Sequence, residues 1–159
     1  DMARNDLDQL RRAAESLGDT SFWGTKVDIQ RQVAEAWILF AEGNTNEALA
    51  LMRLAADRED LTEKSGVSPG PIAPARELLG EMLLAADLPD AALEEFKPAM
   101  NEEPGRFGAL FGAAQAAERI GDMDLASAYY QTLLEICERA DDEARDALMH
   151  ARESIAENE

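Results

Sequence analysis

The side chains that most often act as nucleophiles or metal ligands are rare in this sequence. Its 159 residues include one histidine, His150, and one cysteine, Cys137. A cysteine nucleophile needs a base beside it, and a zinc site needs several Cys or His ligands. We therefore expect His150 to be a surface residue. We expect Cys137, which is spaced helically among apolar residues, to be a buried and inert thiol.

Carboxylates are abundant, but their spacing does not predict a reactive centre. Adjacent pairs such as Glu94-Glu95 point in different directions on a helix, so they are not preformed acid/base pairs. Asp122 and Asp124 lack the twelve-residue ligand spacing and the closing Glu of a calcium loop, and we expect Asp122 to cap the next helix. No phosphate-binding loop, serine-hydrolase string or zinc-protease string occurs. The sequence thus predicts no catalytic residues, no metal site and no cofactor.

Charge restricts the kinds of partner. The 33 acidic and 15 basic residues give a net charge of −18. Nucleic acid and anionic membranes both attract basic proteins, so we expect neither as a partner. The longest apolar run, residues 36–41, is far shorter than the roughly 18–20 residues that span a bilayer. Because 46% of the residues are hydrophobic, the chain is also unlike a disordered acidic tail.

The elements that must position these side chains are helices. Good helix formers dominate, and no stretch alternates apolar and polar residues as a half-buried strand does. Gly and Pro divide the chain into short segments with apolar residues at steps of three and four. Short connections make neighbouring helices antiparallel. The predicted helices cover residues 4–17, 24–42, 45–57, 74–86, 89–101, 106–119, 123–138 and 141–157.

A repeat of about 34 residues runs through these helices. Gly43, Asp87 and Gly121 align at the turn inside successive helix pairs, the first two separated by 34 residues plus an inserted loop. Five residues after each turn comes an alanine, and a large residue follows one helical turn later. We expect each alanine to be buried where the two helices cross. The aligned residues are Ala48, Ala92 and Ala126, followed by Met52, Phe96 and Tyr130.

This pattern resembles the tetratricopeptide repeat (TPR) family. The repeat at residues 73–106 carries the resemblance best, with family-type residues at Leu79, Gly80, Leu83, Ala92, Phe96, Ala99 and Pro104. The repeats depart from the family pattern at Glu35, Asp60 and Glu138. The resemblance implies an all-α fold, an α-α superhelix or TPR solenoid of about three helix pairs. An unrelated stack of helical hairpins is the alternative.

We expect one domain over residues 1–159. Its repeats would cover about 29–62, 73–106 and 107–140, with a loop insertion at 63–72. Helix 4–17 would flank the array, and helix 141–157 would cap its last core with one polar face. The segment from the Pro-rich loop into the next helix resembles the C-terminal portion of long bacterial TPR proteins. An Ala-rich composition with more Arg than Lys also suggests a bacterial source.

In TPR proteins the first helix of each pair lines a concave groove. Family positions place apolar and acidic residues there, and only Arg119 matches the basic set that clamps a peptide C-terminus. A clamp is therefore not expected. The candidate peptide-binding groove consists of Val33, Trp37, Phe40, Glu77, Glu81, Leu84, Phe111, Gln115, Glu118 and Arg119. We expect its acids, chiefly Glu77, Glu81 and Glu118, to be unpaired.

The function that the sequence predicts is a non-catalytic scaffold that binds a protein or peptide, basic or amphipathic in character. The alternative is a structural or self-association segment of a larger multi-repeat bacterial protein. Exposed array ends favour stacking, and Leu7, Leu10 and Leu17 would lie at such an end. The bacterial cytoplasm and periplasm are both compatible with one thiol and no disulfide.

Overall fold

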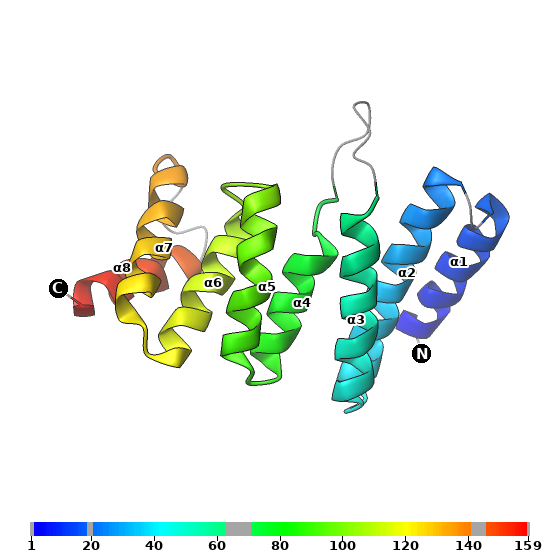
Figure 1. Cartoon of the computed structure of the whole chain (residues 1–159), viewed down its shortest axis with the longest axis horizontal. Helices are drawn as coiled ribbons and strands as arrows, with labels where there is room; N and C mark the ends of the chain where they lie inside the picture. Colours follow the sequence, from blue (N-terminus) through cyan, green and yellow to red (C-terminus); the bar gives the residue numbers. More distant parts are fainter. Residues whose placement is uncertain (1, 19–20, 63–70, 141–145, 159) are drawn as a thin grey trace. The chain divides into compact units, whose positions relative to one another are not determined.

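A computed structural model describes residues 2–18, 21–62, 71–140 and 146–158, and within these ranges the chain is all-α (Figure 1). The all-α prediction is confirmed, and the predicted ends agree to within a few residues. Residues 141–145, the predicted start of the last helix, lie outside the described ranges. The helices of the described ranges are α1 (Met2–Leu17), α2 (Phe22–Ala41), α3 (Thr45–Asp60), α4 (Ala75–Ala85), α5 (Pro89–Glu102), α6 (Phe107–Ile120), α7 (Met123–Ile136) and α8 (Asp146–Asn158).

The three aligned turns share one backbone geometry. Gly43, Asp87 and Gly121 have φ values of 87°, 59° and 82°, in the left-handed region that suits a helix C-terminus. In each turn the N–H of this residue donates a hydrogen bond to the backbone carbonyl three residues earlier. The N–H of the next residue donates a hydrogen bond to the carbonyl five residues earlier. Asp87 is the one non-glycine among them. Asp122 then caps α7 as predicted, since its side chain accepts a hydrogen bond from Leu125 N–H at 3.1 Å.

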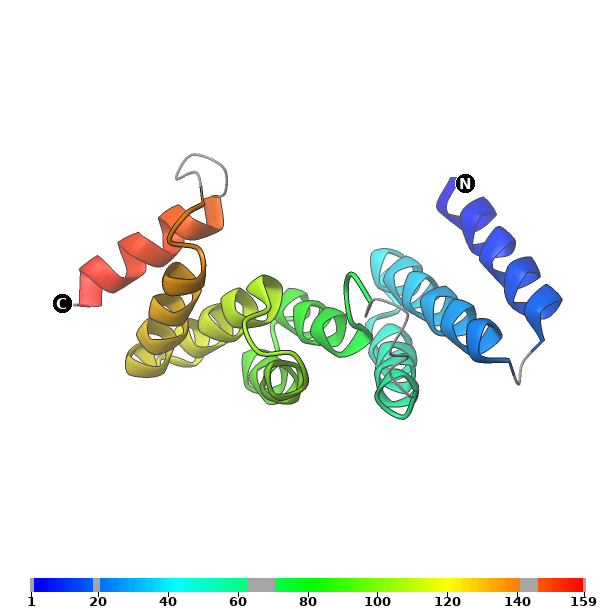
Figure 2. The same cartoon turned by 90° about the horizontal axis from the view of Figure 1, so that it is seen from above.

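The chain consists of two compact units, residues 1–82 and 83–159, which are described separately. In the first unit α2 packs against α1 on one side and α3 on the other (Figure 2). Its core includes Ile29 and Ala36 of α2 with Ala48 and Met52 of α3, and all four are fully buried. The small side chains of Ala36 and Ala48 allow α2 and α3 to approach closely.

Polar side chains of α3 form a hydrogen bond and ion pairs with the first residues of α4. Glu59 accepts a hydrogen bond from the backbone N–H of Ala75 at 2.6 Å, which satisfies one of the free donors at this helix N-terminus. Arg76 forms ion pairs with Asp57 and Asp60, both at 2.7 Å. These contacts link the N-terminus of α4 to the C-terminal end of α3.

In the second unit α6 packs against α5 and α7, and α7 packs against α8 (Figure 2). Ala92 and Ala126 are fully buried, as the repeat predicted, and so are Phe96 and Tyr130. The core cluster between α6, α7 and α8 consists of Leu110, Ala114, Ala117, Ala126, Tyr130, Leu133, Leu148 and Ala151. Within the described residues, no helix is long and apolar enough to cross a membrane.

Candidate peptide-binding surfaces

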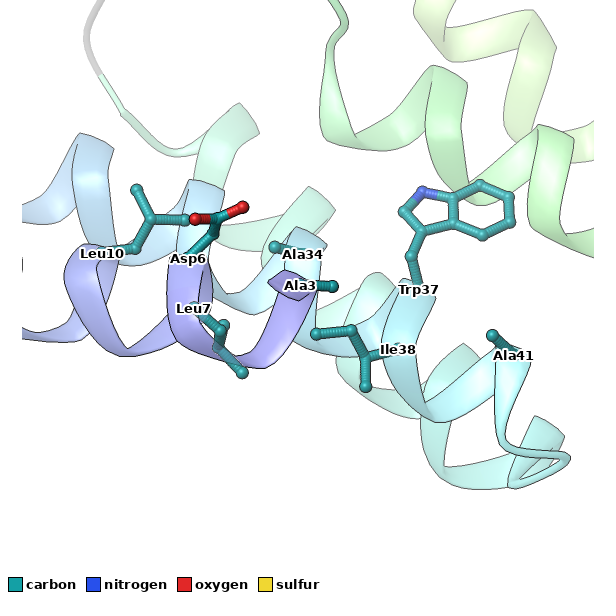
Figure 3. Close-up of a pocket in the computed structure, with 8 residues that line it drawn as sticks. All are labelled: Ala3, Asp6, Leu7, Leu10, Ala34, Trp37, Ile38 and Ala41. Atoms are coloured by element: carbon teal, nitrogen blue, oxygen red, sulfur yellow. The ribbon is translucent and has the colours of Figure 1, made fainter. Parts of the chain in front are cut away.

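An apolar pocket lies between α1 and α2 in the first unit (Figure 3). Its volume is about 410 Å³. The lining comes from the first half of α1 and the second half of α2, because the two helices are antiparallel. Its residues are Ala3, Asp6, Leu7, Leu10, Ala34, Trp37, Ile38 and Ala41.

The base of this pocket is apolar and its rim is open. Leu7 is buried, whereas Leu10, Trp37 and Ile38 are partly buried and retain accessible surface. Asp6, on the exposed side of α1, is the one charged residue of the lining. Among the described residues its carboxylate contacts only Gln9, whose Nε2 donates a hydrogen bond at 3.3 Å. The pocket thus combines exposed apolar surface with one carboxylate that has no cationic partner there.

Trp37 and Phe40, both predicted for the groove, contact each other on α2. Their ring centroids lie 5.8 Å apart with the planes at 81°, an edge-to-face arrangement that aromatic rings favour. Both are partly buried, and Val33 is buried at 6% exposure. Trp37 therefore belongs to the pocket against α1 and also to the aromatic pair on α2.

Glu77 and Glu81 lie one turn apart on α4, on the same helical face. Glu77 is buried at 6% exposure, whereas Glu81 reaches the surface. Partial desolvation of the Glu81 carboxyl, together with the nearby charge of Glu77, raises the pKa of Glu81 above its usual value. No hydrogen bond or ion pair satisfies Glu81 within the described residues. A positive charge placed here would relieve this repulsion.

The α6 residues predicted for the groove lie in the second unit. Phe111 is partly buried and contacts Phe107, Tyr130 and His150, with ring centroids 6.1–6.2 Å apart. Gln115 is partly buried beside them on the same helix. Phe111 thus belongs to an aromatic cluster that spans α6, α7 and α8.

Glu118 is not unpaired, so that expectation is wrong. Its Oε2 accepts a hydrogen bond from Tyr130 Oη at 2.8 Å and lies 3.0 Å from His150 Nε2. Its Oε1 accepts a hydrogen bond from Ser154 Oγ. The sequence did not predict this arrangement because two of the partners are on α8, more than 30 residues away.

Burial and hydrogen bonding act in opposite directions on this carboxylate. Burial alone would raise the pKa of Glu118, but hydrogen bonds from Ser154, His150 and Tyr130 together lower it. Burial and the charge of Glu118 both raise the pKa of Tyr130. The ionised form of Glu118 is therefore the form that the surrounding donors stabilise.

Two further groove candidates, Arg119 and Leu84, form a hydrogen bond with each other. Arg119 donates a hydrogen bond from Nη1 to the backbone carbonyl of Leu84 at 2.7 Å, at the C-terminus of α4. A cation at this position also interacts favourably with the negative end of the helix dipole. Leu84 itself is buried at 7% exposure.

The two residues first considered for catalysis lie in α8 and at the end of α7. His150 is exposed but contacts Glu118, Phe111 and Tyr130, so it is more than an isolated surface histidine. Cys137 is partly buried at the end of α7, not fully buried as expected. In the part of the chain that the structure describes, no cluster of three His, Cys, Asp or Glu residues is arranged to hold a metal ion.

The sequence did not single out the pocket between α1 and α2. Leu7, Leu10 and Leu17 were expected at an array end, and Asp6 had no assigned role. The apolar stripe of α1 was visible, but a stripe does not reveal which part of it a neighbouring helix leaves uncovered. That information depends on how α1 packs against α2.

No protein-family model matches the sequence, and no curated protein matches it. Solved structures are similar in fold. PcrH from Pseudomonas aeruginosa superposes with a TM-score of 0.62 at 14% identity, over 82% of this chain and 90% of PcrH. PcrH in complex with the chaperone binding region of PopB gives a TM-score of 0.61 at 14% identity, over 80% and 94% of the two chains.

The P58(IPK) TPR domain gives a TM-score of 0.60 at 15% identity. The alignment covers 99% of this chain but 43% of the P58(IPK) chain, so the present chain spans less than half of that structure. At such low identity these similarities establish the fold alone. The chain therefore has a TPR-like, all-α helical-repeat fold.

Proposed function

We propose that the chain is a non-catalytic scaffold that binds a basic or amphipathic protein segment. The observation that carries this proposal is the carboxylate pair on α4. Glu81 reaches the surface without a hydrogen-bond or ion-pair partner among the described residues, and partial desolvation together with the charge of Glu77 raises the pKa of Glu81. A Lys or Arg from a partner would stabilise the ionised form of Glu81 and remove this repulsion.

Apolar residues of α2 and α6 provide the second part of the proposed surfaces. Trp37 and Phe40 supply partly buried aromatic rings in the first unit, and Phe111 supplies one in the second. Aromatic residues are the usual anchors of protein interfaces because they bury large areas with few rotatable bonds. Of the remaining candidates, Val33 and Leu84 are buried, whereas Gln115 is partly buried and Arg119 is exposed.

The fold comparisons support a binding function by analogy. PcrH has been solved with the chaperone binding region of PopB, so at least one protein of similar fold holds a polypeptide partner. Fold similarity does not transfer the partner, and the chemistry of this chain's own residues decides what binds.

A peptide panel tests the proposal. We expect a peptide with Lys or Arg beside large apolar residues to bind the full chain, and the same peptide with Glu in place of the bases not to bind. Glu81→Gln should weaken binding about two- to fivefold, the range for one exposed ion pair. Glu47→Gln on α3, which removes an equal and exposed charge, is the matched control. Equal binding of the acidic and basic peptides would contradict the proposal.

A structural or self-association function is the second candidate. Phe22 and Trp23, at the start of α2, are 36% and 57% exposed and contact each other edge to face at 5.1 Å. Leu17, at the end of α1, is 45% exposed. This function predicts that molecular mass in sedimentation equilibrium rises with protein concentration and that Trp23→Gln abolishes the increase. A constant monomer mass would exclude it.

A further inference from the structure

We propose that the pocket between α1 and α2 binds an amphipathic helix of a partner protein. The helix would insert one large apolar side chain, and a Lys or Arg three or four positions away on the same face would pair with Asp6. This inference rests on the proposed function as a protein-binding scaffold. It assigns a different site, since neither Asp6 nor the surface of α1 belongs to the α4 carboxylate pair.

The shape of the pocket favours a protein side chain over a small molecule. Small-molecule sites are usually enclosed and carry several convergent polar groups. This pocket is open at Ala3, Asp6 and Ala41, all of which are exposed, and Asp6 is its one charged group. A volume of about 410 Å³ accommodates a Leu, Phe or Met side chain that projects from a helix lying across the opening.

The two walls suit a helical ligand. α1 and α2 are antiparallel neighbours, and the pocket lies along the groove between them. A helix laid in such a groove presents side chains at i, i+3 and i+4 to its floor. Leu7, Leu10 and Ile38 would then lose their remaining contact with water, which is the principal favourable term in association of this kind.

Charge complementarity identifies the partner as basic. Within the described residues, the Asp6 carboxylate accepts one weak hydrogen bond from Gln9 and forms no ion pair. Asp8, on the same helix, is by contrast neutralised by Arg11 at 3.0 Å. Arg4, next to the lining residue Ala3 in the sequence, is occupied by an ion pair with Glu42. Asp6 is thus the acid of the pocket lining that remains available to a cation from outside, and the net charge of −18 attracts such a partner.

Tryptophan emission provides a direct readout. The chain has two tryptophans, Trp23 and Trp37, so Trp23→Phe leaves Trp37 of the pocket as the sole reporter. The probe is a helical peptide of about 18 residues with one Leu, a Lys four positions later and an otherwise Ala- and Gln-based sequence. We expect its binding to the full chain to shift Trp37 emission to shorter wavelength, because the indole becomes shielded from water.

Variants of both molecules define the contact. Asp6→Asn should weaken binding about two- to fivefold, whereas Asp8→Asn, which removes the same charge two residues further along α1 and outside the lining, should not. Ala3→Phe, at an exposed position, should fill the pocket and reduce binding at least tenfold. Peptides with Leu→Ala or Lys→Glu should each bind more weakly than the parent.

The same experiments separate this inference from the proposed function. Equal effects of Asp6→Asn and Asp8→Asn, or unchanged binding to Ala3→Phe, would overturn the pocket assignment. If Glu81→Gln weakens binding of a basic peptide while the pocket variants do not, the scaffold function stands and the pocket assignment fails. A shift of Trp37 emission that follows the concentration of the chain itself, without peptide, would mean that a second copy occupies the pocket and would also overturn the inference.

Discussion

Gly112 is a position where one methyl group decides the packing of two helices. A Cβ built at this residue of α6 would overlap the ring of Phe96 on α5, with Cε1 and Cε2 at 2.7 and 2.8 Å. Phe96 is fully buried, so its ring has no free space into which to move. The absence of a side chain at Gly112 therefore allows α5 and α6 to pack face to face.

We expect Gly112→Ala to destabilise the chain by about 1–3 kcal/mol, the usual cost of overpacking, despite the higher helix propensity of alanine. Urea unfolding measures the change in the free energy of unfolding. The paired change Gly112→Ala with Phe96→Leu should recover part of the loss, since the smaller side chain frees the space. An unchanged midpoint for the single variant would show that α5 and α6 can separate without cost.

Gln32 is a residue whose chemistry conflicts with its surroundings. It lies on α2 at 7% exposure, and its Oε1 is buried with no hydrogen-bond partner in the described part of the chain. An unsatisfied buried acceptor costs about 1–3 kcal/mol. We expect Gln32→Met, which keeps the length of the side chain, to raise the free energy of unfolding by about 1 kcal/mol. Gln30→Met, at an exposed position of the same helix, should leave it unchanged. A loss of stability in Gln32→Met would mean that the amide is satisfied by bound water.

At the scale of elements, α8 depends on Glu118 as well as on apolar packing. Leu148 and Ala151 of α8 are buried against α6 and α7, and Glu118 of α6 accepts hydrogen bonds from Ser154 and Tyr130 and contacts His150. The carboxylate thus links three helices through one pair of oxygen atoms. Loss of its charge weakens all of these contacts at once.

This arrangement predicts acid sensitivity. Because the folded state lowers the pKa of Glu118, its contribution to stability is fully present above the unfolded value of about 4.3 and is lost as the pH falls through the folded value. At pH 5 we expect Glu118→Gln to be less stable than the wild type by about 1–3 kcal/mol, as for hydrogen bonds to a charged group. The difference should shrink as the pH is lowered to 3.

Thermal unfolding of both proteins between pH 3 and pH 5 measures this difference. Glu135→Gln, at an exposed position of α7, is the matched control and should follow the wild type throughout. A constant gap between wild type and Glu118→Gln would show that the charge of Glu118 does not contribute to the docking of α8.

Local signals were sufficient to predict the helices, but not the sites. Breakers such as Gly43 and Gly121 mark turns directly, and the aligned alanines predict helix crossings because only a small residue fits there. The partners of Glu118 and the opening beside Asp6 depend instead on which residues of distant helices meet. Periodicity identifies a helix face, whereas the neighbour that covers this face is set by tertiary packing.

At the scale of the whole molecule, net charge governs how partners approach. The chain carries a charge of −18, and the proposed contacts at Glu81 and Asp6 place individual acids where a basic segment would bind. A field of this sign attracts cationic ligands from a distance and raises the association rate, whereas the apolar contacts mainly determine how slowly the complex dissociates.

The charge predicts a specific kinetic behaviour for binding of the basic probe peptide. Between 0.02 and about 0.5 M salt, we expect the association rate constant to fall at least tenfold, because the Debye length shrinks from roughly 20 Å to below 5 Å. The dissociation rate constant should change much less, since burial of Leu against the pocket is not screened by salt. Stopped-flow measurement of Trp37 emission in Trp23→Phe separates the two constants. A peptide with Gln in place of its bases should associate at a rate nearly independent of salt. If both peptides respond equally to salt, then the charge of the molecule does not steer its encounters, and the preference for a basic partner must be abandoned.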